Sequence, residues 1–181
     1  MTRVLGRPLV HQTEPIEANV LRRVCGLFVT GVAVITSGDG DQATGTTVNS
    51  FTSVSLEPPL VLFCLHLNSR LNATLESTGT FGVNLLTGQQ EPVAWAFAGR
   101  TPAGFTPSYR RCAEGVPVLA DAMAYLACRI VNRFPGGDHV IVLGEVLEVG
   151  WPRRRDPLIF FQGTFGVLED EFPPVHPVWD G

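Results

Sequence analysis

The sequence predicts a mainly β fold, an antiparallel β-barrel with small helical additions. At least seven short segments rich in apolar and β-branched residues follow one another at short spacing, and few stretches show helical periodicity. No Gly-x-Gly-x-x-Gly motif follows a predicted strand, so no Rossmann-type nucleotide site is indicated. Any dinucleotide would therefore have to bind to this barrel in another way.

Length and composition indicate one domain over residues 1–181, with a flexible arm at 1–12 and a tail at 169–181. Charged residues make up only 17% of the chain and apolar residues 45%. Because so little charge is unusual for the whole surface of a monomer, we expect a second copy to cover part of it in a homodimer. The net charge of −4 leaves no basic footprint, which argues against nucleic acid as a partner.

Other classes of protein find little support in the sequence. No apolar run is long enough to span a bilayer and no secretory segment is present, so we expect a cytoplasmic protein without a membrane partner. The cysteines show no Cys-x-x-Cys spacing, and three of them have the apolar surroundings of reduced core residues. The four histidines are scattered, so no metal site is expected.

The elements are predicted from periodicity and from turn residues. We expect helices over 13–25, 70–77 and 89–98, and strands over 29–37, 42–48, 60–65, 80–86, 123–133, 139–149, 158–161 and 164–168.

Three helix features carry expectations of their own. The first helix should be capped by Thr13 and should pack one apolar face on the body of the domain. The second should be capped by Asn68 or Ser69, and its start beside Arg70 is either an ordinary cap or an anion site. The third should end at Gly99 as its C-terminal glycine.

The second half of the chain adds two further expectations. Residues 100–115 lack periodicity and indicate a long loop. The strand 139–149 is apolar on both faces, which fits a barrel wall that is also a dimer interface.

The segment Gly45–Ser55 is the most unusual stretch, because seven of its eleven residues carry hydroxyl or amide side chains. Buried polar groups need partners, so these side chains either pair within the protein or meet a polar ligand. Uncharged donors and acceptors suit a heteroaromatic ring with a carbonyl and amide edge, or a phosphate. A strand with an exposed polar face would explain the same composition.

Five segments in order resemble the short-chain flavin reductases, from about Leu21 to Leu168. They are Gly-Thr-Thr-Val-Asn-Ser-Phe-Thr-Ser-Val-Ser-Leu-Glu-Pro-Pro-Leu-Val at 45–61, Phe-Gly-Val-Asn-Leu-Leu at 81–86, Phe-Ala-Gly at 97–99, Gly-Gly-Asp-His at 136–139 with Gly-Glu-Val at 144–146, and Pro-Leu-Ile-Phe-Phe-Gln-Gly at 157–163. Proteins of this family are the reductase components of two-component flavin-dependent monooxygenases and have an FMN-binding split-barrel fold.

The resemblance implies an enzyme that transfers a hydride from C4 of NADH to N5 of FAD or FMN and supplies reduced flavin to a partner monooxygenase. No cluster of arginines marks a site for a 2′-phosphate, so NADH is favoured over NADPH. The sequence does not decide between FAD and FMN, and it favours FAD only slightly. A flavin-binding module without turnover, such as a sensor or carrier, is the alternative. A pyridoxamine-phosphate oxidase on a related barrel would need more basic residues.

The resemblance also assigns residues. His139 would contact the nicotinamide, and Phe165 would stack near the same opening. The cofactor-binding residues would be Thr46, Thr47, Val48, Asn49, Ser50, Ser53, Cys64, Leu65, Asn68, Ser69, Arg70, Ala98, Gly99, Arg100, His139 and Phe165. The chain departs from the family at 66–69, where it reads His-Leu-Asn-Ser, and at Gln162, where the family often has arginine.

Overall fold

The computed structural model describes residues 13, 15–39, 43–151 and 156–168, and it confirms the predicted antiparallel β fold. The predicted arm at 1–12 and the predicted tail at 169–181 lie outside the described residues, as do residues 40–42 and 152–155. The strands are β1 (Thr30–Gly31), β2 (Ala33–Ser37), β3 (Thr44–Val48), β4 (Thr52–Leu56), β5 (Pro59–His66), β6 (Thr80–Leu85), β7 (Tyr109–Arg111), β8 (Pro117–Leu119), β9 (Ala124–Gly136), β10 (His139–Gly150), β11 (Leu158–Phe161) and β12 (Thr164–Val167). The α-helices are α1 (Ala18–Cys25), α2 (Leu71–Thr78) and α3 (Glu91–Phe97), and short 3-10 turns lie at Gly88–Gln90 and Ala113–Gly115.

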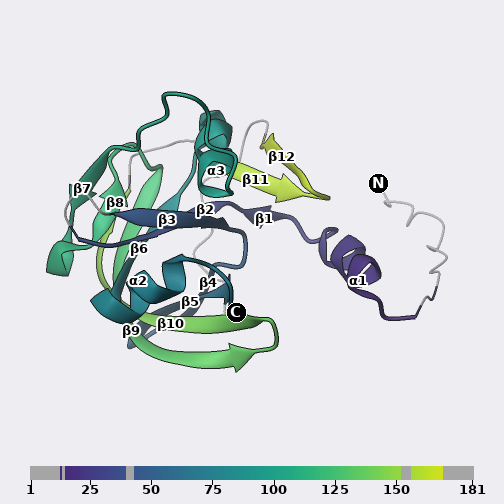
Figure 1. The fold of residues 1–181 in the computed structure, drawn as a ribbon, viewed down its shortest axis with the longest axis horizontal. Helices are drawn as coiled ribbons and strands as arrows, with labels where there is room; N and C mark the ends of the chain where they lie inside the picture. The colour runs from purple at the N-terminus through teal and green to yellow at the C-terminus, as the bar shows by residue number, and fades with distance from the viewer. Residues whose placement is uncertain (1–12, 14, 40–42, 152–155, 169–181) are drawn as a thin grey trace, which may run out of the picture.

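Seven strands form the main sheet, in the order β3-β2-β6-β9-β10-β5-β4, and the neighbouring strands are antiparallel. The sheet curls around one core, with α2 against the barrel and α3 beside the small β1-β11-β12 sheet (Figure 1). The side chain of Ser50, just after β3, reaches β5, where its Oγ bonds both the N–H and the C=O of Cys64 at 3.0 and 3.1 Å. This contact joins the end of β3 to β5, two described strands that are not neighbours in the sheet.

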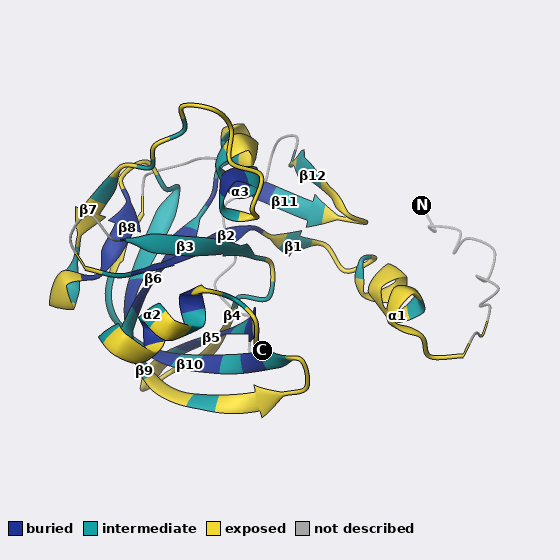
Figure 2. Ribbon diagram, in the orientation of Figure 1, coloured by how far each residue is buried: buried dark blue, intermediate teal, exposed yellow. Residues whose placement is uncertain are grey.

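The core fills the barrel. Its largest fully buried side chains include Phe63 from β5, Phe81 from β6 and Leu75 from α2. Phe63 and Phe81 meet edge to face, with ring centroids 5.1 Å apart, a favourable arrangement for aromatic rings. The buried residues coloured dark blue in Figure 2 lie along the inner strands of the main sheet.

The packing predicted for the first helix is wrong. The helix α1 begins at Ala18 rather than at Thr13, and none of its residues is buried. Ile16 is 90% exposed and Val24 60% exposed, and Figures 1 and 2 show the helix standing clear of the barrel. Hydrophobic periodicity correctly predicted a helix here, but it does not specify what covers the apolar face.

The strand β10 alternates between buried and half-buried residues, so one of its faces packs in the core and the other stays partly accessible in one chain. Two further expectations need correction. The predicted loop at 100–115 contains β7, which pairs with β8. Of the cysteines, only Cys128 is buried, while Cys64 and Cys112 are half-buried and Cys25 is exposed.

Asn84, the polar residue predicted inside β6, is fully buried and completely used. Its Nδ2 donates to Val34 O at 2.8 Å and to Thr36 Oγ1 at 2.9 Å, and its Oδ1 accepts from Leu119 N–H at 2.6 Å. The side chain therefore ties β2, β6 and the end of β8 together, where an unpaired amide would be costly.

Candidate functional site

Three cavities surround the end of β3. The first cavity, of about 240 Å³, is lined by Thr46, Thr47, Val48, Asn49, Ser50, Cys64, Leu65, His66, Ser69 and His139. The second cavity, of about 250 Å³, is lined by Val32, Thr47, Val48, Asn49, Trp95, Ala98, Phe160, Gly163 and Phe165. The third cavity, of about 300 Å³, includes Gly45, Arg70, Phe97, Gly99, Phe105 and Tyr109. Residues 47–49 line both the first and the second cavity, so these two adjoin.

The local fold explains why the polar run lies here. Thr47 donates its hydroxyl to Ala94 O of α3 at 2.7 Å, and Ser50 is held against Cys64. These two residues fasten the strand end between α3 and β5. In the described part of the chain, no hydrogen bond engages the side chains of Thr46 and Asn49. Two uncharged polar side chains therefore remain for a ligand in the first cavity.

His139, at the start of β10, also lines the first cavity. Its Nδ1 is 2.7 Å from Asp138 Oδ1, and this hydrogen bond is the main reason why the pKa of Asp138 is lowered. The carboxylate fixes one nitrogen of the imidazole, so Nε2 is the nitrogen available to a ligand.

The predicted site residues divide into groups. Nine of them line the first cavity, namely Thr46, Thr47, Val48, Asn49, Ser50, Cys64, Leu65, Ser69 and His139. Ala98 and Phe165 line the second cavity, and Arg70 and Gly99 the third. Phe165 thus lines the cavity that adjoins the one lined by His139. Ser53, Asn68 and Arg100 line none of the three, and Ser53 is exposed on the edge strand β4.

Several lining residues, His66 and Trp95 among them, lie outside the predicted set. His66 stands opposite His139 in the β5–β10 ladder, a long-range register that one sequence does not display. Trp95 lines the second cavity, where its ring meets Phe165 edge to face at 5.0 Å. Arg100 lies over the same indole, 4.3 Å from its centroid, which explains its position outside the cavities.

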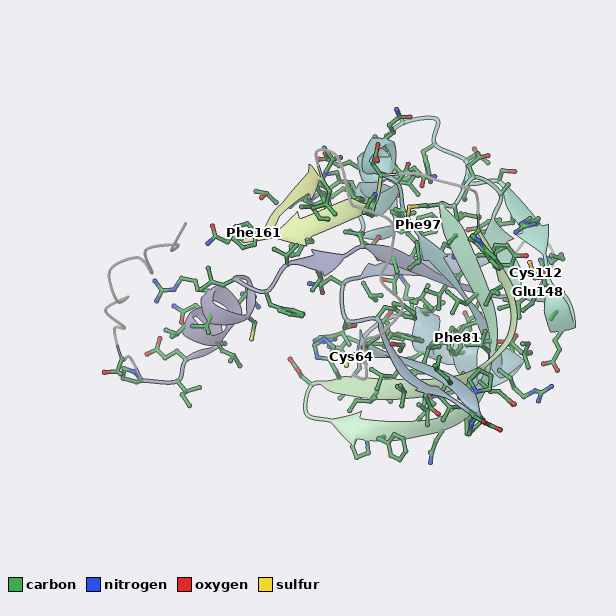
Figure 3. The ribbon with its side chains drawn as sticks, turned by 180° about the vertical axis from the view of Figure 1, so that it is seen from behind. Cys64, Phe81, Phe97, Cys112, Glu148 and Phe161 are labelled. Carbon is green, nitrogen blue, oxygen red and sulfur yellow. The ribbon has the colours of Figure 1, made fainter. Side chains whose placement is uncertain are left out.

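A second group of titratable side chains lies elsewhere. Glu148 accepts hydrogen bonds from Tyr125 Oη at 2.7 Å and Ala113 N–H at 2.8 Å, and both lower its pKa, Tyr125 the more. Desolvation and then Glu148 raise the pKa of Cys112. Figure 3 shows Cys112 and Glu148 together, well away from Cys64. This cluster ties the end of β10 to β9 and to the turn after β7.

The described residues provide neither a metal site nor a membrane-spanning helix. Among the described residues, no three histidine, cysteine or acidic side chains gather in a way that could hold a metal ion. In the same part of the chain, no helix is long and apolar enough to cross a membrane.

The first and second cavities suit a flavin by their chemistry. The first offers hydroxyl and amide groups, the donors and acceptors that a ring with carbonyl and imide edges requires, and neither an acidic nor a lysine side chain lines it. The second is walled by the aromatic residues Trp95, Phe160 and Phe165. Such a mixture of apolar walls and a few convergent polar groups is typical of cofactor sites.

Known proteins agree with this description. Residues 25–169 match the family described as flavin reductase like domain. An NADH-dependent flavin reductase from Rhodococcus sp is 40% identical over 154 residues, covering 82% of this chain and 85% of the relative. HsaB of Mycobacterium tuberculosis (strain CDC 1551 / Oshkosh), the reductase subunit of a flavin-dependent monooxygenase, is 37% identical over 166 residues, covering 89% and 88%.

Solved structures extend the likeness to the fold. Flavin reductase PheA2 superposes with a TM-score of 0.81 at 32% identity, covering 86% of this chain and all of that one (100%). The NADH:FAD oxidoreductase SgcE6 of Streptomyces globisporus C-1027, in complex with NAD and FAD fragments, gives 0.76 at 40% identity, covering 90% and 98%.

The chain therefore belongs to the flavin reductase family, as predicted. The predicted enzyme class, with NADH and FAD or FMN as cofactors, agrees with the names of these relatives.

Proposed function

We propose that this protein is an NADH-dependent flavin reductase that reduces FAD, or FMN, and releases the reduced flavin to a separate monooxygenase. Reductase subunits of such two-component systems are among its relatives. The observation that carries the proposal is the first cavity, where polar side chains from β3, β5 and β10 meet. Among the described residues, no hydrogen bond joins a hydroxyl or thiol of this cavity to His66 or His139, as a nucleophile–base pair for hydrolysis would require. When bound, NADH and the flavin supply the hydride transfer themselves, so the protein need only hold them.

Each part of the site would have a distinct task. Thr46 and Asn49 would bind the polar edge of the flavin, while Thr47 and Ser50 keep the strand end in place through their bonds to Ala94 and Cys64. His139, held by Asp138, would meet the nicotinamide. The aromatic residues of the second cavity would cover apolar parts of the cofactors and exclude water.

Anaerobic mixing tests the activity. The purified protein is saturated with FAD or FMN and mixed with NADH or NADPH while the oxidised flavin absorbance is followed. We expect rapid bleaching with NADH and much slower bleaching with NADPH, since no cationic cluster lines these cavities for a 2′-phosphate. Flavin that binds but stays oxidised would instead identify a carrier or sensor.

Replacing His139 tests the assignment of the nicotinamide side. We expect His139→Ala to raise the KM for NADH by about ten-fold, as the loss of one good polar contact does, with flavin affinity nearly unchanged. Steady-state kinetics and a flavin titration by fluorescence measure the two effects. An equal loss of both affinities, or no loss of either, would remove the assigned role.

We further propose a cytoplasmic homodimer in which residues 1–181 form a single domain. The uncovered apolar face of α1 and the exposed apolar residues of the outer barrel, such as Leu56 and Trp151, support a second copy as partner.

A further inference from the structure

We propose that His66 is a positioning residue, which holds the imidazole of His139 in the orientation that meets the nicotinamide. This inference rests on the proposed function and adds to it a residue at a place where the chain departs from its family. The two histidines are direct partners in the β5–β10 ladder. Their rings meet edge to face, with centroids 5.2 Å apart and planes at 77°.

The ring of His66 is itself fixed. The backbone N–H of Asn68 donates to His66 Nδ1 at 3.0 Å, so this nitrogen keeps its lone pair and the proton of the neutral ring lies on Nε2. A side chain clamped to its own turn in this way can act as a rigid wall for a neighbour.

The turn that carries His66 is rigid as well. Ser69 N–H and Asn72 Nδ2 both donate to His66 O, at 2.9 and 3.0 Å. Leu67 N–H donates to Asp138 O at 3.0 Å and so joins this turn to the one that carries His139. The two turns therefore form one unit at the rim of the first cavity.

His139 is thus held from two sides, by Asp138 at Nδ1 and by the ring of His66. The carboxylate of Asp138 belongs to a side chain that is 79% exposed, so Asp138 itself is not held in place by packing. The ring of His66 limits the remaining freedom of the imidazole, and both histidines line the first cavity. An ordered contact group lowers the entropy that binding must otherwise overcome.

Two replacements separate the ring from its nitrogen. His66→Phe keeps an aromatic edge and loses the acceptor for Asn68, whereas His66→Asn keeps an acceptor and loses the ring. We expect His66→Ala and His66→Asn to raise the KM for NADH about three- to ten-fold, the range of one aromatic pair, with kcat within about two-fold. His66→Phe, which keeps the ring but loses its hydrogen bond to Asn68, should raise the KM less than His66→Ala does, by about two-fold. Leu67→Ala, at the neighbouring exposed position of the same turn, is the matched control and should change neither constant.

A double-mutant cycle decides between positioning and any other role. If His66 acts through His139, His66→Ala should have no further effect on the KM for NADH in the His139→Ala background. Additive effects, or a change in flavin affinity as large as the change in KM, would overturn the proposal and leave the reductase activity standing. A wild-type protein that never oxidises NADH would instead refute the proposed function itself. The melting temperatures of all variants are measured as well, so that a change in KM caused by unfolding is recognised.

Discussion

At the scale of single residues, hydrogen bonds divide the polar run that begins at Thr46 into two kinds. Thr47 and Ser50 are structural, because their hydroxyl groups join β3 to α3 and to β5. Thr46 and Asn49 have no such bond in the described part of the chain. The sequence predicted that the run would be either paired within the protein or held for a ligand, and the structure shows the pairing for Thr47 and Ser50. Which residues are structural and which have no such bond depends on the contacts of this run with α3 and β5, and both are distant from it in the sequence.

Asn84 shows the cost of a buried polar residue most clearly. We expect Asn84→Ala to lower the free energy of unfolding by about 2–4 kcal/mol, because Leu119 N–H loses its acceptor inside the core. Urea denaturation followed by circular dichroism measures the change. Asn132→Ala, an exposed asparagine on β9 whose Oδ1 bonds only the next residue, is the control and should shift it by less than about 0.5 kcal/mol. Equal shifts in the two variants would contradict this account.

At the scale of elements, local patterns predicted which segments form helices and strands better than they predicted what those segments pack against. Alternation and turn residues gave the hairpin of β9 and β10, and Gly99, with φ of +88°, does follow the end of α3. The apolar stripe of α1 predicted a helix, but one sequence does not show what packs against that stripe. The short strand β7 was missed because Tyr109–Arg111 has no apolar alternation and gains its order from β8.

Gly82 on β6 is required by close packing between elements. An added Cβ would lie 2.6 Å from Pro117 O and 2.7 Å from Thr36 Oγ1, both in the buried network around Asn84. We expect Gly82→Ala to destabilise the protein by about 1–3 kcal/mol, the usual effect of overpacking. Gly31→Ala, on strand β1 with nothing within 4 Å of the added atom, should be nearly neutral in the same thermal-melting assay. A neutral Gly82→Ala would show that β6 and β8 can move apart at no cost.

At the scale of the whole molecule, the barrel and the family were predictable because the resemblance extends over most of the chain in order. How the site residues divide between the cavities was not predictable. Phe165 and His139 were predicted near one opening, and the β1-β11-β12 sheet places Phe165 beside Trp95 in the second cavity, which adjoins the first. Which cavity a residue lines depends on the pairing of strands that are distant in the sequence. The sequence identifies the residues but does not specify that pairing.

The proposed homodimer predicts the state of the protein in solution. We expect sedimentation velocity to give a dimer for the wild type, and Ile16→Glu with Val24→Glu to shift it towards monomer, because charge would enter a buried apolar contact. Arg22→Ala, a change on the same exposed helix, is the matched control and should leave the dimer intact. A monomeric wild type would refute the homodimer, and a dimer unaffected by the two glutamates would show that the segment from Ile16 to Val24 is not its contact.

Residues 47–49 line both the first and the second cavity, and this limits how the ligand preference of the protein can change in evolution. A substitution at Thr47, Val48 or Asn49 alters both cavities at once. Independent adaptation is confined to positions that line one of the two, such as Cys64 and His66 in the first or Trp95 and Phe160 in the second. Among related chains that differ in preference for one ligand alone, we expect substitutions to accumulate at such unshared positions and to be rare at residues 47–49.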